Sequence, residues 1–131
     1  MGRILSLEKF LSTISRTFPG GPLAGREEAL ARLDPEKIYL ENVRSVLGVS
    51  SSQAFRICEA AVRRGVFQRM TEVLCPDGAV AASASMESEL PERVHCWIDE
   101  GGQLADVEIP TSELTKTTFY RFKDARPEDN R

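Results

Sequence analysis

The sequence predicts an α+β protein in which helices come first and strands follow. Apolar residues recur at helical spacing as far as about residue 65. From Val66 onward the period shifts toward two, which is typical of strands. The chain has 131 residues, 28% charged and 41% hydrophobic, an ordinary globular composition. We therefore expect one domain, or one small domain with an added lobe.

Residues 1–33 are predicted to form an N-terminal helical segment. A first helix is expected over residues 6–16, where one apolar stripe is formed by Leu7, Phe10, Leu11 and Ile14. Residues 18–25, FPGGPLAG, are rich in helix breakers and predict a connector. Residues 26–33 predict a second, short helix. The apolar stripe could pack on the core or pair with a second copy of the chain.

Residues 34–75 predict a winged helix-turn-helix. Asp34-Pro35 is expected to open a helix, because Asp is a good N-cap and Pro is favoured at the first helical position. Gly48 ends that helix, and Ser50 caps the next one, residues 51–64. Gly65 stands where a C-terminal glycine belongs, and a strand over residues 66–75 follows.

Residues 76–122 predict a β-rich lobe. The expected strands are residues 79–84, 94–98, 103–109 and 117–122, with turns at 76–78 and 99–102. The charged residues 123–131 are expected to be a flexible tail.

Charge is unevenly distributed along the chain. The net charge is −3, but residues 38–70 carry five arginines against Glu41 and Glu59. Residues 71–131 carry thirteen acidic and six basic groups. The helix-turn-helix is thus the basic part of an acidic protein. An acidic docking surface for a basic partner is also conceivable, formed by Glu87, Glu89, Glu92, Asp99, Glu100, Asp106 and Glu108.

Helix 51–64 is the candidate recognition element. In DNA-binding proteins of this class, residues near the start of the second helix contact base edges, and arginines hold phosphates. The candidate DNA- or partner-binding residues are Arg44, Ser51, Ser52, Gln53, Arg56, Arg63, Arg64 and Arg69. However, Glu59 lies three residues after Arg56 and four before Arg63, so it partly neutralises this face. Docking of a protein partner is therefore favoured, with DNA as the alternative.

Two short motifs resemble the knuckles of a zinc ribbon. They are CPDG at residues 75–78 and CWID at residues 96–99, separated by 17 residues. Gly78 and Asp99 stand where the second cysteines would be, so Cys75 and Cys96 are degenerate ligand positions and no metal is expected. The turns are expected to be held instead by Val73, Val80, Val94, Trp97 and Ile109.

The three cysteines also bear on the compartment. An odd count, with no secretory signal, indicates a reducing environment and hence the cytoplasm. A disulfide between Cys75 and Cys96 is sterically conceivable but disfavoured on that ground. His95 is expected on the opposite strand face from Cys96.

The sequence offers no assembly of groups for catalysis. His95 is the only histidine, and no Gly-rich phosphate loop is present. No run of 18 apolar residues predicts a membrane span. We therefore expect a protein that is not an enzyme and has no cofactor.

Residues 34–122 as a whole resemble a bacterial winged-helix domain fused to a zinc-ribbon-like wing. The resemblance is carried by DPEKIYLENVRSVLGVS, AVRRGVF and the LCPDG and LPERVHCWIDE hairpins that end in FYRF. Such proteins are accessory components of bacterial multi-component systems, including defence systems. The resemblance implies a non-catalytic adaptor or regulatory subunit, or a sequence-specific DNA-binding regulator that uses helix 51–64.

Overall fold

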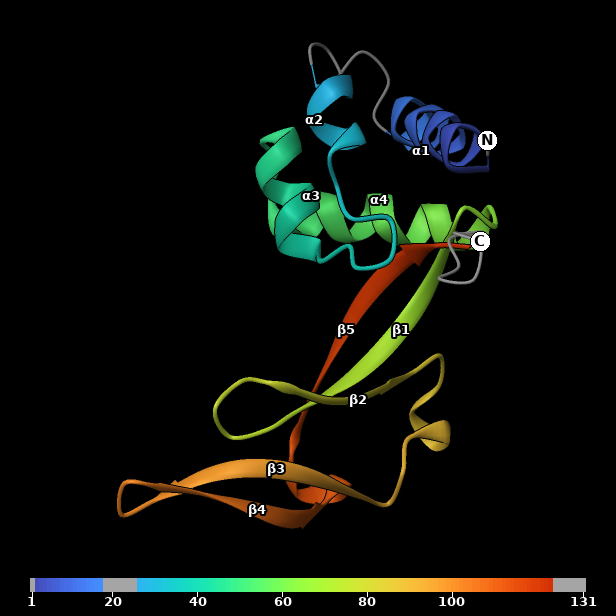
Figure 1. Cartoon of the computed structure of the whole chain (residues 1–131). Helices are drawn as coiled ribbons and strands as arrows, with labels where there is room; N and C mark the ends of the chain where they lie inside the picture. Colours follow the sequence, from blue (N-terminus) through green and yellow to red (C-terminus); the bar gives the residue numbers. More distant parts are fainter. Residues whose placement is uncertain (1, 18–25, 124–131) are drawn as a thin grey trace. The chain divides into compact units, whose positions relative to one another are not determined.

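The computed structural model describes residues 2–17 and 26–123. The described residues form a mixed α+β structure with four helices and two antiparallel sheets (Figure 1). The helices are α1 (Gly2–Thr17), α2 (Glu27–Ala31), α3 (Leu40–Leu47) and α4 (Ser51–Arg63). The predicted connector 18–25 and most of the predicted tail lie outside the described residues.

All five predicted strands are present, with ends shifted by at most two residues. They are β1 (Phe67–Leu74), β2 (Val80–Ala84), β3 (Arg93–Glu100), β4 (Gln103–Pro110) and β5 (Thr115–Phe122). One sheet has the order β2-β1-β5, and the other is the β3–β4 hairpin. Short 3-10 turns, η1 (Glu87–Glu89) and η2 (Thr111–Glu113), flank the hairpin.

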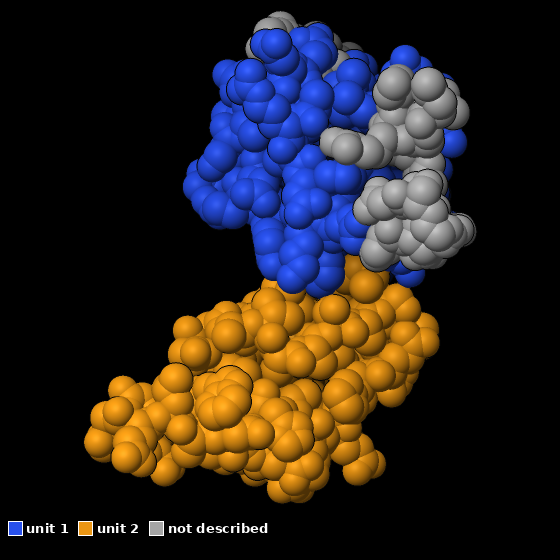
Figure 2. Space-filling model, in the orientation of Figure 1, with its two compact units in different colours: residues 1–69, 119–131 blue, residues 70–118 orange. Residues whose placement is uncertain are grey.

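The chain divides into two compact units (Figure 2). Unit 1 comprises Met1–Arg69 and Phe119–Arg131, and unit 2 comprises Met70–Thr118. This division differs from the borders expected at residues 33, 75 and 122. The reason is that β1 and β5 each contribute residues to both units, whereas the sequence pattern assigned each strand to one.

The core of unit 1 is aromatic where the helices meet the strands. Phe10 of α1 lies 4.6 Å from Phe67 of β1, and Phe67 lies 5.4 Å from Phe122 of β5, measured between ring centroids. Phe10 and Ile14 are fully buried, with Leu7 and Leu11 packed beside them. The apolar stripe of α1 therefore packs on the chain's own core.

The start of α3 corrects one expectation from the sequence. The helix begins at Leu40, because Ile38 and Tyr120 exchange both backbone hydrogen bonds, at 2.7 and 2.8 Å. A residue paired in this way is extended and cannot be helical. Asp34 instead accepts a hydrogen bond from the Glu36 amide in a turn.

The turn between α3 and α4 follows the expected chemistry. Gly48 ends α3 with φ of 66°, a conformation that favours glycine. Ser50 caps α4: the Gln53 amide donates to Ser50 Oγ at 3.1 Å, and the Ser50 amide donates to Gln53 Oε1 at 3.0 Å. The inward side of α4 is fully buried and consists of Ala54, Ile57, Cys58 and Ala61.

Unit 2 has a small core that is closed by a disulfide. Cys75, after β1, is bonded to Cys96 of β3, and only Val94 is as well buried in the same cluster. The expectation that Cys75 and Cys96 are not bonded was wrong, because an odd cysteine count leaves room for one disulfide and one buried thiol, Cys58. The expectation that Trp97 and Val80 hold the turns was also wrong, since they are 59% and 43% exposed.

The disulfide predicts how many cysteine thiols of each chain can react with a thiol reagent. Protein purified without reductant and then denatured should show one reactive thiol per chain, and three after reduction. The folded protein should show none, because burial raises the pKa of the Cys58 thiol to about 12. Titration with a chromogenic disulfide reagent measures this. Three thiols in the unreduced, denatured sample would contradict the disulfide.

Candidate partner-binding face on helix α4

One side of α4 points away from the core of unit 1 and carries an aromatic residue among charges. Phe55 is 53% exposed, although it is a large apolar side chain. It borders an open hollow between α4 and the end of α1, of about 500 Å³. The lining residues, which we call the α4 face, are Thr17, Phe55, Arg56, Glu59, Ala60 and Arg63.

Glu59 is the best-anchored member of the α4 face. Its carboxylate forms an ion pair with Arg69 of β1, and it accepts a 2.7 Å hydrogen bond from the Tyr120 hydroxyl of β5. The bond from Arg69 holds the pKa of Glu59 below its usual range. Burial, together with the bond to Glu59, raises the pKa of Tyr120. Glu59 is therefore a carboxylate that joins α4 to both strands.

Several candidate residues from the sequence make contacts within the chain. Arg44 forms an ion pair with Glu41 on the same helix. Arg64 donates a 2.9 Å hydrogen bond to the Thr13 hydroxyl of α1, and Arg69 is held by Glu59. The internal partners of Arg44, Arg64 and Arg69 would compete with a phosphate.

The other candidate residues divide by their position on α4. Gln53 takes part in the helix cap, so its amide oxygen already has a partner. Ser51 and Ser52 are exposed at the start of the helix. The structure brings Arg56 and Arg63 together along the α4 face, on either side of Glu59. Arg56 and Arg63 are thus the candidate arginines that share a surface with Phe55.

Phe55 was missed as a binding candidate. The inward positions of α4 are 54, 57, 58 and 61, so Phe55 falls outside the apolar stripe. A large apolar residue on the polar side of an amphipathic helix is a detectable signal.

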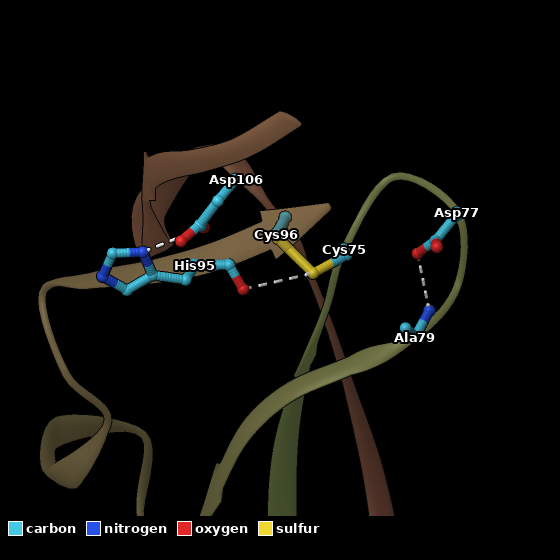
Figure 3. Close-up of a disulfide and its surroundings, with 6 residues drawn as sticks. All are labelled: Cys75, Asp77, Ala79, His95, Cys96 and Asp106. Carbon is cyan, nitrogen blue, oxygen red and sulfur yellow. Dashed lines mark hydrogen bonds and ion pairs between the residues drawn. A yellow bond between two sulfur atoms is a disulfide. The ribbon is translucent and has the colours of Figure 1, made fainter. Parts of the chain in front are cut away.

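The zinc-ribbon-like positions do not converge on a ligand cluster. Cys75 and Cys96 are bonded to each other, and His95 Nδ1 lies 3.1 Å from Asp106 Oδ1, on the opposite face of β3 from Cys96 (Figure 3). Within residues 2–17 and 26–123, no three His, Cys, Asp or Glu side chains gather as metal ligands would.

Comparisons with protein-family models, curated proteins and solved structures find no match to this chain. Among the described helices, none is long and apolar enough to cross a membrane.

Glu59 predicts a pH dependence of stability. Its pKa is lowered by folding, so its contribution is present above the unfolded value of about 4.3 and is lost as the pH falls through the folded value. Glu59→Gln should lower the free energy of unfolding by about 1–2 kcal/mol at neutral pH. The difference from wild type should shrink below about pH 4.

Urea unfolding over a pH series measures this effect. Glu41→Gln is the matched control, because it breaks an exposed ion pair that contributes little to stability. A difference between Glu59→Gln and wild type that stays constant across pH would show that the charge of Glu59 is irrelevant.

Proposed function

We propose that this protein is a non-catalytic adaptor or regulatory subunit of a multi-protein assembly, docking a protein partner through the α4 face. The observation that carries the proposal is the exposed Phe55, which lies beside Arg56, Glu59 and Arg63. Aromatic residues and arginine are enriched at the centres of protein interfaces. The Glu59 carboxylate between Arg56 and Arg63 gives this face charges of both signs, which suits a protein partner of mixed charge.

The order of elements supports a winged helix-turn-helix as the scaffold of this face. Helices α3 and α4 are joined by a tight turn at residues 48–50, and α4 leads directly into β1. Strand β5 lies beside β1 in the sheet. In this arrangement the second helix presents its outer side to a binding partner.

The second candidate function is a sequence-specific DNA-binding regulator. It is favoured by the exposed Ser51 and Ser52 at the start of α4 and by Arg56 and Arg63 along it. It is weakened by the internal partners of Arg44, Arg64 and Arg69 and by the net charge of −3.

The adaptor proposal predicts that Phe55 is needed for a specific association. In the native host, a tagged chain with a photo-crosslinking phenylalanine at position 55 should capture one defined partner. Phe55→Ser should reduce co-purification of that partner at least about tenfold, the loss of a typical aromatic anchor. The captured partner is then purified and its affinity is measured.

Met86→Ser is the matched control, because Met86 is an apolar side chain in unit 2 that is 56% exposed. It should leave the association unchanged. Equal loss in both variants, or no loss in Phe55→Ser, would reject the α4 face as the docking site.

A further inference from the structure

The β3–β4 hairpin of unit 2 leaves two large apolar side chains in solvent. Trp97 and Leu104 are 59% and 69% exposed. Trp97 lies directly opposite Asp106, and Leu104 lies opposite Asp99. Because side chains alternate along a strand, these residues share one face. We call it the hairpin face, consisting of His95, Trp97, Asp99, Leu104, Asp106 and Glu108.

Buried residues and a disulfide fix the opposite side of the hairpin in place. The opposite side of β3 carries Val94 and Cys96, both buried, and Cys96 is tied to Cys75 by the disulfide. The two strands are paired over their full length. At the turn, the Gly102 amide donates a 3.1 Å hydrogen bond to Asp99 Oδ1. The indole of Trp97 therefore does not contribute to the core of unit 2. An exposed apolar side chain of this kind is typical of a binding surface.

The charge around Trp97 selects the chemistry of a partner. Unit 2 carries ten acidic side chains, whereas Arg93 and Lys116 are its only basic ones apart from His95. Asp106 is paired with His95 at 3.1 Å, and Glu108 with Arg93 at 3.6 Å (Figure 3 shows the first pair). Both pairs are about half exposed or more, so they are weak and can be exchanged for an incoming cation.

We propose that the hairpin face binds a basic, arginine-containing segment of a protein partner. An arginine guanidinium stacks on the exposed face of Trp97 and donates hydrogen bonds to Asp106, while a neighbouring basic residue meets Asp99. Guanidinium suits this site because it stacks on aromatic rings and pairs with carboxylates in a planar fork. The proposal rests on the adaptor function in giving it a second binding surface, but it does not involve the α4 face.

The position of Trp97 provides the readout, because it is the only tryptophan in the chain. The full-length protein is titrated with an octapeptide of alternating arginine and alanine, with a peptide of alternating glutamate and alanine as the negative control. We expect saturable change in tryptophan emission with the basic peptide only. Asp99→Asn/Asp106→Asn should weaken its binding at least about tenfold.

The control is a double variant that removes two acidic charges from another part of unit 2. Glu89→Gln/Glu113→Gln neutralises two carboxylates in η1 and η2, outside the hairpin face, and should change affinity less than about twofold. Equal losses in both double variants would show diffuse attraction to an acidic unit and would overturn the proposal. So would the absence of any change in emission.

A labelled peptide followed by anisotropy tests the indole itself. Trp97→Ala should weaken binding about fivefold, and Trp97→Phe should weaken it less, because a ring is kept. Circular dichroism checks that each variant is folded. Unchanged affinity in folded Trp97→Ala would overturn the proposal. Phe55→Ser should bind the peptide normally, so failure of the α4 face and failure of the hairpin face are distinguishable.

Discussion

The carboxylate of Glu59 is the point at which three elements of unit 1 meet. It receives the Arg69 guanidinium from β1 and the Tyr120 hydroxyl from β5, and Tyr120 in turn pairs through its backbone with Ile38. The same side chain also separates Arg56 from Arg63 on the α4 face. One residue thus fixes the strands against α4 and sets the mixed charge of the surface that α4 presents.

Unit 2 is held together differently. Its buried apolar cluster is too small to dominate its stability, so the Cys75–Cys96 disulfide supplies much of the constraint that a larger core would supply. Because the disulfide holds the inner side of the β3–β4 hairpin, the side chains on its outer side need not be buried for stability. The indole of Trp97 can therefore remain in solvent without loss of the fold.

The sequence predicted those features that depend on local chemistry. The cap at Ser50, the end of α3 at Gly48 and the alternation that separates His95 from Cys96 follow from neighbouring residues, and the structure has all three. The start of α3 could not be predicted in this way, because it depends on a backbone pair between Ile38 and Tyr120, far apart in the chain.

The contacts of the candidate binding residues and of the cysteines also depend on residues that are far apart in the sequence. The partners of Arg64 and Arg69 lie on other elements, and the disulfide depends on how β1 and β3 are arranged in unit 2.

Fluorescence anisotropy of labelled duplex DNA over a salt series tests most directly whether the α4 face recognises protein and not DNA. We predict no saturable binding even at about 50 mM salt. Tight binding that weakens steeply with salt, and that is lost in Arg56→Ala, would contradict the account.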